Sequence, residues 1–324
     1  MDPASFCDSR HQWRHGYRNI SSWPLRQSTS FCGICEPGKC RRFVCLVAGR
    51  TPRLGCACDS IYWSAVYTGS NRKVAGVEGR VALVTGGSRG IGRAAAETLA
   101  SRGASVMCVA RTEHELEETG LDYSVADLGT SEGCAQAVAD TEQRLGPIDI
   151  LICNHGIGSA HERVVWEQEP DIWDETMRVN LDGPFHLSRL VLKGMTERRY
   201  GRIVYTSSTA GLVAEHAGSA YTSSKHGLIG LMRSVSRDAG PFGVTSNAVL
   251  PGWVRTEMAE RSARQEAKDR GISADQVWEE RAALYPPGRV VTPQEVADLI
   301  AFLASEESSG VSGEAIRVAL GSVW

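Results

Sequence analysis

Long apolar stretches are missing from this chain of 324 residues. No run reaches the roughly 18 to 20 apolar residues that a membrane-spanning helix needs, so we expect no membrane partner. The N-terminus also lacks a charged start followed by an apolar segment, so a secretory signal peptide is not expected. With 42% hydrophobic and 23% charged residues, the composition is typical of a globular protein.

An excess of basic residues is missing from the main part of the chain. Residues 1–73 hold eleven Lys and Arg against four Asp and Glu, whereas the formal net charge of the whole chain is -3. Everything beyond residue 73 is therefore distinctly acidic. Because an acidic surface repels phosphate backbones, we expect no nucleic-acid partner.

The cysteines do not form a disulfide framework or a complete zinc-finger pattern. Seven of the ten lie before residue 60, and Cys32-x2-Cys35 has no second Cys-x2-Cys to match it. Residues 1–76 also show no sustained helical or strand period. We interpret them as a disordered or irregular extension that buries too little apolar surface to fold, with a zinc site or an organelle transit segment as alternatives. The other three cysteines are scattered, which favours a reducing, cytoplasmic location.

From Arg80 onward, short apolar runs alternate with longer amphipathic stretches. Alternation of helices with Val-rich strands indicates a parallel sheet covered on both faces. The predicted strands are 81–85, 105–110, 121–126, 149–153, 202–206, 244–249 and 315–319. The predicted helices are 91–102, 132–145, 171–198, 219–239 and 294–305. The sequence therefore predicts an α/β fold, a Rossmann-type doubly wound parallel sheet in a single domain over residues 77–324.

A glycine-rich turn lies between the first predicted strand and the first predicted helix. It reads Thr85-Gly86-Gly87-Ser88-Arg89-Gly90-Ile91-Gly92. The glycines permit a tight turn and a close approach to a pyrophosphate, whose charge the N-terminus of the helix stabilises. The position of the turn indicates a dinucleotide site rather than a plain strand-to-helix connection.

A tyrosine and a lysine lie four residues apart in the predicted helix 219–239. This spacing places Tyr221 and Lys225 on one helix face, about one turn apart. Since a free tyrosine titrates near pH ~10, a nearby ammonium group is needed to favour its phenolate form. Tyr221 is thus a candidate to protonate a carbonyl oxygen, or to deprotonate an alcohol in the reverse direction.

Together these motifs resemble the short-chain dehydrogenase/reductase family, in its single-domain branch and with a likeness to 3-oxoacyl-acyl-carrier-protein reductases. The resemblance extends from Val77 to the C-terminus and depends first on the Gly-x3-Gly-x-Gly spacing. It implies an oxidoreductase that interconverts a secondary alcohol and a ketone, acting on a small molecule as a homodimer or homotetramer. The alternative is a cofactor-binding regulator or scaffold without turnover.

The resemblance also implies catalytic residues. Ser208, which precedes Tyr221 by 13 residues, matches the family's catalytic serine that orients the substrate oxygen, with Ser207 as the rival. Asn180 matches the asparagine that holds a water in a proton relay to the lysine. Its alternative role, which does not exclude the first, is a helix distortion with a backbone bond. The predicted catalytic set is Asn180, Ser208, Tyr221 and Lys225, and no catalytic metal is expected.

Cofactor choice depends on the end of the second strand. An acidic residue there would bind the ribose 2′-OH of NAD, but the chain has Ala110 and Arg111. Arg111 and Arg89 suit a 2′-phosphate, so we expect NADP(H) rather than NAD(H). Alternatively, Arg111 lies along the adenine, as it can in NAD-dependent members. The predicted cofactor-binding residues are Gly86, Ser88, Arg89, Gly90, Ile91, Gly92, Arg111, Asp127, Leu128, Asn154, Gly156, Tyr221, Lys225, Pro251, Gly252, Val254 and Thr256.

Four further features follow from the resemblance. Asp127 matches the family's adenine-contacting aspartate, with capping of the next helix as an additional or alternative role. His155 replaces a small residue, and we interpret it as a packed or solvent-edge side chain rather than a proton carrier. The segment of about 258–287 corresponds to a mobile lid over the substrate. The C-terminus lacks the Asp-Gly-Gly motif that forms a tetramer contact in the family.

Overall fold

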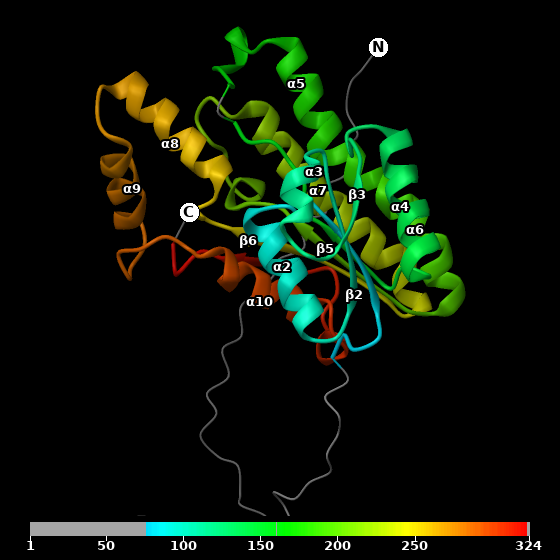
Figure 1. The fold of residues 1–324 in the computed structure, drawn as a ribbon. Coiled ribbons are helices and arrows are strands. Elements are labelled where there is room, and N and C mark those ends of the chain that lie inside the picture. Colours follow the sequence, from blue (N-terminus) through cyan, green and yellow to red (C-terminus); the bar gives the residue numbers. More distant parts are fainter. Residues whose placement is uncertain (1–75, 160, 323–324) are drawn as a thin grey trace, which may run out of the picture. The chain divides into compact units, whose positions relative to one another are not determined.

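The computed structural model describes residues 76–159 and 161–322. Within them, seven parallel strands form one sheet in the order β3-β2-β1-β4-β5-β6-β7 (Figure 1). The strands are β1 (Val81–Thr85), β2 (Ser105–Ala110), β3 (Asp122–Val125), β4 (Ile150–Cys153), β5 (Gly201–Thr206), β6 (Val244–Pro251) and β7 (Ala315–Val318). The predicted Rossmann-type fold is confirmed, with every strand within two residues of its predicted bounds. Apart from Gly76, the predicted extension and its zinc and transit alternatives lie outside the described residues.

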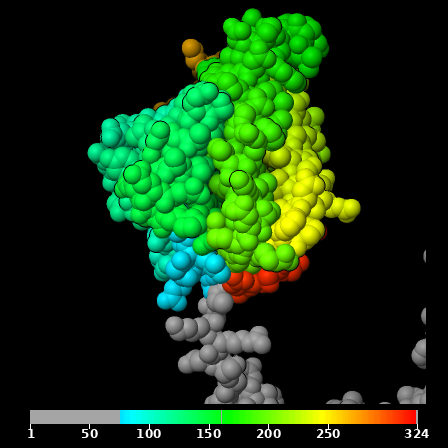
Figure 2. Space-filling view, turned by 90° about the vertical axis from the view of Figure 1, so that its right-hand side faces the viewer, coloured from blue at the N-terminus to red at the C-terminus, as the bar shows by residue number. Residues whose placement is uncertain are grey.

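Helices cover both faces of the sheet, so the neighbouring strands β1 and β4 are buried along their whole length. The helices are α2 (Gly90–Ser101), α3 (Glu113–Glu117), α4 (Ser131–Leu145), α5 (Pro170–Met177), α6 (Gly183–Arg198), α7 (Ser219–Ala239), α8 (Glu257–Arg270), α9 (Ala274–Ala283) and α10 (Pro293–Leu303). Helices α2 and α10 pack together on one face (Figure 1). Figure 2 shows the other face, where α4 in teal, α6 in yellow-green and α7 in yellow lie side by side.

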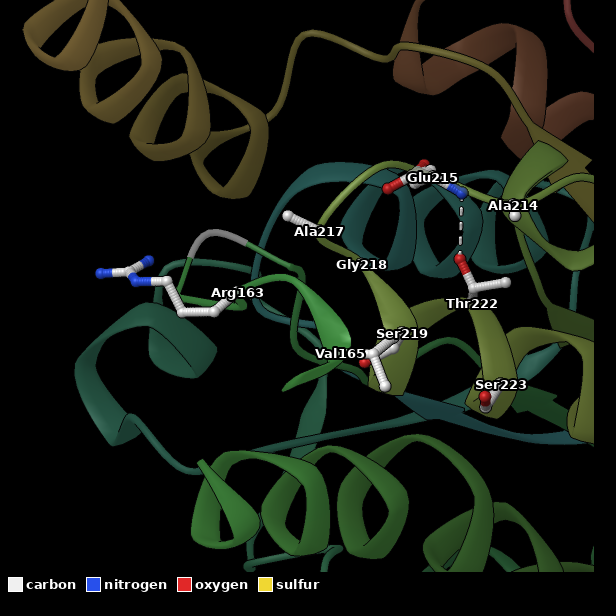
Figure 3. A pocket seen from close by; sticks show the side chains of 9 residues that line it. All are labelled: Arg163, Val165, Ala214, Glu215, Ala217, Gly218, Ser219, Thr222 and Ser223. Carbon is white, nitrogen blue, oxygen red and sulfur yellow. Dashed lines mark hydrogen bonds between the residues drawn. The ribbon is translucent and has the colours of Figure 1, made fainter. Parts of the chain in front are cut away.

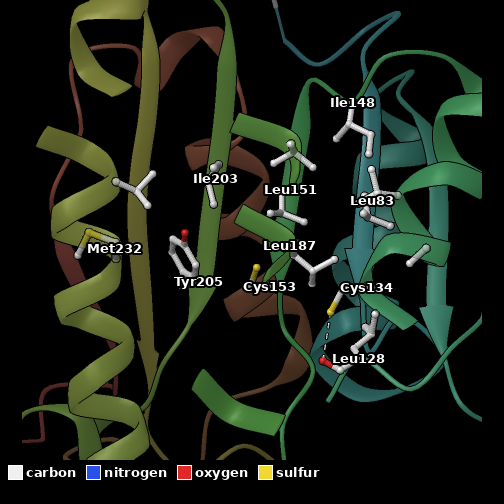
Figure 4. Close-up of a cluster of buried hydrophobic side chains, with 14 of the residues drawn as sticks. Leu83, Leu128, Cys134, Ile148, Leu151, Cys153, Leu187, Ile203, Tyr205 and Met232 are labelled. Atoms are coloured by element: carbon white, nitrogen blue, oxygen red, sulfur yellow. Dashed lines mark hydrogen bonds between the residues drawn. The ribbon is translucent and has the colours of Figure 1, made fainter. Parts of the chain in front are cut away.

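Each face has its own hydrophobic core. Alternate residues of β1 point to opposite faces, so Leu83 joins the core under α4, α6 and α7, whereas Ala82 and Val84 join the core under α2 and α10. Figure 4 shows the first core, in which Tyr205 of β5 is completely buried. The Tyr205 hydroxyl lies 2.6 Å from Ser188 Oγ, so this polar group has a partner in the core.

The single helix predicted over residues 171–198 is interrupted. Between α5 and α6, residues Arg178–Asp182 form one wider turn, η2, of the π type. Pro184 has no N–H, so the usual α-helical bond to the Asn180 carbonyl cannot form. The Asn180 side chain also bonds the backbone of Ile157, which confirms the distortion that was its alternative role. The widened turn thus presents Asn180 to the loop after β4.

Helices α8 and α9 form a separate small layer beside the sheet (Figure 1). They enclose their own cluster of buried residues, made of Ala259, Ala263, Ala267, Val277 and Trp278. These two helices cover most of the predicted lid, although α8 begins at Glu257, before the predicted bound. Among the described residues, no helix combines the length and apolarity needed to cross a membrane.

Candidate active site

The candidate site lies at the carboxyl edge of the sheet, where β1 and β4 are neighbours. Helices leave β1 and β4 toward opposite faces, which opens a crevice at this point of an α/β sheet. Thr85, the last residue of β1, ties the two strands together. Its buried Oγ1 accepts hydrogen bonds from the Asn154 and His155 backbone N–H groups at 2.9 and 3.2 Å. Thr85 was not among the predicted site residues.

The glycine-rich turn has the geometry of an anion cradle. Gly86 and Gly90 have φ values of 62° and 58°, which favour glycine. A Cβ at Gly92 would lie 2.0 Å from the Gly86 carbonyl oxygen, so only glycine lets α2 start this close to the turn. No described side chain caps α2, whose N-terminal N–H groups can bind a pyrophosphate. These residues therefore fit a dinucleotide cofactor.

The side of this cradle that faces α3 contains a residue that the sequence analysis missed. Ser88 Oγ donates to Glu115 Oε2 at 2.9 Å, and Arg89 Nη1 donates to Glu115 Oε1 at 3.0 Å. Glu115 lies on the one-turn helix α3, four residues beyond the exposed Arg111. In the sequence, the only sign of this contact is that Glu115 lies shortly after Arg111 in the connection between β2 and β3. Such a position is a weak signal.

Asp127 lies beyond β3 and does not cap the next helix. Thr130 caps α4 instead, since its side chain accepts the Gly133 N–H. Asp127 Oδ1 accepts the Gly129 N–H at 3.0 Å, and this bond is the main cause that lowers the pKa of the Asp127 carboxyl. The capping alternative for Asp127 is therefore wrong, and its predicted adenine contact stays a prediction.

Tyr221, Lys225 and Ser208 come together at the end of β5. Lys225 Nζ lies 5.6 Å from the centre of the Tyr221 ring and donates to the Thr206 carbonyl at 3.0 Å. Ser208 Oγ accepts the Ala210 N–H at 3.1 Å, and Ser208 is near enough to Tyr221 to affect the pKa of its hydroxyl. The rival Ser207 instead donates to the Lys225 carbonyl and supports the helix. Helix spacing and the strand end thus bring the predicted set together.

The protonation state of Tyr221 differs from the one expected from Lys225 alone. Burial raises the pKa of Tyr221 well above its usual range, and the nearby Glu215 carboxylate raises it further, against the bond from Ser208. Burial also lowers the pKa of Lys225 to about 8. Lys225 therefore does not by itself hold Tyr221 as phenolate, because desolvation dominates. Tyr221 carries its proton and is ready to act as an acid.

Asn180 and His155 bond residues next to the catalytic candidates: Asn180 bonds Ser224 of α7, and His155 contacts Thr85 of β1. Asn180 Oδ1 accepts the Ile157 N–H at 2.8 Å, and Asn180 Nδ2 donates to the Ile157 carbonyl and Ser224 Oγ. Burial lowers the pKa of His155 to about 3, and its Nδ1 lies 2.8 Å from Thr85 Oγ1. A neutral, packed His155 agrees with the interpretation that it is not a proton carrier.

Glu162 is a second residue that sequence reasoning missed. Its carboxylate accepts the N–H groups of Ala220 and Tyr221 at 2.8 and 2.7 Å, and only 5% of the residue is exposed. It thereby caps the N-terminus of α7, the helix that carries Tyr221 and Lys225. Glu162 comes from the loop after β4, 59 residues before Tyr221. A single glutamate in a loop offers no sequence signal for such a contact.

A cavity of about 220 Å³ lies beside the start of α7 (Figure 3). Glu215, Ser219 and Thr222 are among the residues that line it, and the Glu215 N–H donates to Thr222 Oγ1 at 3.3 Å. Burial raises the pKa of the Glu215 carboxyl. Glu215 thus places a partly desolvated carboxyl group at this cavity, and its charge raises the pKa of Tyr221.

The turn after β6 is held by Tyr285, a residue of the predicted lid segment. The Trp253 N–H donates to the Tyr285 hydroxyl at 2.6 Å, and a Cβ at Gly252 would lie 2.4 Å from that hydroxyl. Val254 pairs with Val291, and Thr256 caps α8 through the Ala259 N–H. The predicted cofactor-contacting turn and the lid are therefore built as one unit.

Thr256 also brings this turn to the glycine-rich loop. A Cβ at Gly90 would lie 3.2 Å from Thr256 Cγ2, so the two predicted cofactor-binding segments are neighbours. The lid itself is held by Arg281, whose guanidinium lies 3.6 Å from the Trp253 ring centre and bonds Glu266 at 2.9 Å. The roles predicted for the site residues remain predictions, but the fold gathers them along one edge.

Comparison with known proteins agrees with this geometry. The family described as short chain dehydrogenase matches residues 80–267. The chain belongs to this family. Its members are oxidoreductases that act on CH–OH groups with NAD(P), so this chain is an enzyme of that class. Such enzymes act on small carbonyl or alcohol substrates.

The matches to individual relatives extend over nearly the whole length of each relative. The chain is 35% identical over 253 residues to the 3-oxoacyl-(acyl-carrier-protein) reductase of Escherichia coli (strain K12), covering 74% of this chain and 96% of the relative. It is 34% identical to the D-beta-hydroxybutyrate dehydrogenase of Cupriavidus necator, covering 73% and 95%. Among solved structures, levodione reductase matches with a TM-score of 0.72 at 30% identity, covering 75% of this chain and 97% of that one. Actinorhodin polyketide ketoreductase with NADPH matches with a TM-score of 0.69 at 34% identity, covering 75% and 96%.

Proposed function

We propose that this enzyme interconverts a secondary alcohol and a ketone with NADP(H), and that Tyr221 is its general acid and base. The observation that carries the proposal is the grouping of Tyr221, Lys225 and Ser208 at the end of β5, with Lys225 Nζ 5.6 Å from the Tyr221 ring centre and 3.0 Å from the Thr206 carbonyl oxygen. These groups lie at the edge of the sheet that holds the glycine-rich turn. When bound, the nicotinamide supplies or accepts the hydride.

The residues of this chain handle the substrate oxygen and its proton. In the direction of reduction, the Tyr221 hydroxyl donates its proton to the carbonyl oxygen as that oxygen gains charge. The Ser208 hydroxyl hydrogen-bonds the same oxygen and orients it. The Lys225 ammonium stabilises the phenolate that Tyr221 becomes. The Asn180 side chain fixes the loop at Ile157, and we propose that its region supports proton return to Lys225.

Three observations support NADP(H) as the cofactor. Arg89 lies in the glycine-rich turn, and Arg111 follows the second strand where an acid would favour NAD. A guanidinium can grip a phosphate through two bonds. The similar actinorhodin ketoreductase was solved with NADPH.

The relatives that act on 3-oxoacyl or hydroxybutyrate compounds favour a β-keto or β-hydroxy substrate.

The proposal is tested with purified protein, NADPH and a panel of ketones that includes 3-oxoacyl thioesters. We expect the wild type to oxidise NADPH and Tyr221→Phe to lose about 100- to 10,000-fold in kcat, the usual contribution of a general acid. Binding of NADPH to Tyr221→Phe should persist. The control is Tyr123→Phe, which removes the half-buried β3 hydroxyl that bonds Glu117 and should keep its activity. Full turnover by Tyr221→Phe would show that another group carries the proton.

A further inference from the structure

Arg89, the guanidinium proposed to bind a 2′-phosphate, lies between two carboxylates. Its Nη1 is 3.0 Å from Glu115 Oε1 and 2.5 Å from Glu257 Oε2. Glu115 is the less accessible of the two, with 24% of its side chain exposed against 51% for Glu257. Ser88 holds the second oxygen of Glu115 at 2.9 Å. Two donors of the glycine-rich turn, Ser88 and Arg89, thus hold the Glu115 carboxylate.

These contacts change the charge balance at the adenosine end of the site. Arg89 and Arg111 alone would form a doubly positive site for a phosphate. Glu115 and Glu257 offset that charge, so an incoming phosphate meets a carboxylate already bonded to its guanidinium. A ribose 2′-OH meets no such conflict, because a carboxylate accepts a hydrogen bond from a hydroxyl.

We propose that Glu115 sets the cofactor preference of this enzyme, by opposing the 2′-phosphate of NADP(H) and accepting the 2′-OH of NAD(H). The inference rests on the proposed function only in placing the 2′ position of the cofactor near Arg89. In NAD-dependent members, an acidic residue at the end of β2 accepts the hydrogen bond of the ribose 2′-OH. Here Glu115 takes that role from α3, the helix that follows β2. The wild type then still uses NADP(H), as proposed above, but Glu115 narrows its preference over NAD(H), and Arg89 binds the phosphate only when it leaves Glu115.

Glu117 offers a matched control on the same helix. It is exposed, and its Oε1 accepts a hydrogen bond from the Tyr123 hydroxyl at 3.4 Å instead of binding the glycine-rich turn. Glu115→Gln and Glu117→Gln both remove one negative charge from α3. A general change in the charge of the helix therefore affects both variants, whereas a local effect at the 2′ position affects only the first.

The test measures the Kd of NADPH and of NADH by fluorescence titration of the full chain without substrate, for the wild type, Glu115→Gln and Glu117→Gln. We expect Glu115→Gln to raise the ratio of NADPH to NADH affinity on the order of tenfold, since it removes a like charge at a partly exposed site. Glu117→Gln should leave the ratio unchanged. Arg89→Leu should lower NADPH affinity while retaining NADH.

Several results would overturn the inference. An unchanged ratio in Glu115→Gln would do so, as would an equal shift in both variants. A loss of NADPH affinity in Glu115→Gln would show that Glu115 orients Arg89 for the phosphate instead of opposing it. Failure of the proposed function has a different signature, which is tight nucleotide binding without turnover of any ketone. If neither nucleotide binds, both proposals fail.

Discussion

At the scale of single residues, burial decides the chemistry of the Tyr221 and Lys225 pair. Both groups are forced toward their neutral forms, Tyr221 by a raised pKa and Lys225 by a pKa lowered to about 8. An ammonium held in a desolvated site reduces the stability of the folded protein while it serves the reaction. Functional and stabilising requirements therefore conflict at Lys225.

This conflict predicts that Lys225→Met is more stable than the wild type near pH 7. Unfolded Lys225 keeps its proton up to its ordinary pKa of 10.5, whereas the folded protein releases it near 8, so wild-type stability rises with pH between these values. We expect Lys225→Met to gain about 1–3 kcal/mol in the free energy of unfolding at pH 7. Its advantage should shrink as the pH rises past 8. Urea denaturation at a series of pH values measures this, and a variant less stable than the wild type at pH 7 contradicts it.

At the scale of elements, the contact between β1 and α2 depends on the absence of a side chain. The glycine-rich turn brings the Gly86 carbonyl within 2.0 Å of where a Cβ of Gly92 would lie. A methyl group there must push α2 away from the turn, because a backbone atom cannot swing aside. The N-terminus of α2 would then no longer point at the pyrophosphate.

Gly92→Ala is accordingly expected to weaken NADPH binding at least tenfold and to reduce the free energy of unfolding by about 1–3 kcal/mol. The matched control is Gly230→Ala in α7, where a Cβ meets nothing within 4 Å. That change should stabilise the protein by up to about 1 kcal/mol, since glycine is costly inside a helix. Nucleotide titration and urea denaturation measure the two effects. Equal behaviour of the two variants would contradict the close contact at Gly92.

At the scale of the whole molecule, a charged cluster joins distant segments at the sheet edge opposite the candidate site. Arg80 and Arg202 lie over the Tyr200 ring, with guanidinium carbons 3.6 and 4.5 Å from its centre. Both arginines bond Glu306 at 3.1 Å. Arg202 is 3% exposed, so its charge relies on this carboxylate and on nearby carbonyls.

We therefore expect Glu306→Gln to destabilise the protein without changing its chemistry. A buried guanidinium loses its ionic partner, but a third of Glu306 is exposed, so the loss in the free energy of unfolding should be about 1–2 kcal/mol. The kcat of the enzyme should stay the same, because the cluster lies at the amino ends of the strands. A drop in kcat with unchanged stability would contradict this separation of roles.

The sequence by itself determined the seven strands, the glycine-rich turn and the shared helix face of Tyr221 and Lys225. These depend on local period and on backbone conformations, which neighbouring residues encode. The interruption of the helix at Asn180 was partly visible, because Pro184 removes one backbone donor. The long uninterrupted helix was nevertheless the simpler prediction.

Only the tertiary structure decided which charges meet at the site. Glu115, Glu162 and Glu215 reach the glycine-rich turn, the start of α7 and the surroundings of Tyr221 from separate loops and helices. Desolvation and Coulomb energies depend on distances through space, which no spacing along the chain encodes. For that reason the sequence predicted a reactive tyrosine, whereas the fold determined that Tyr221 keeps its proton and that Arg89 is already paired.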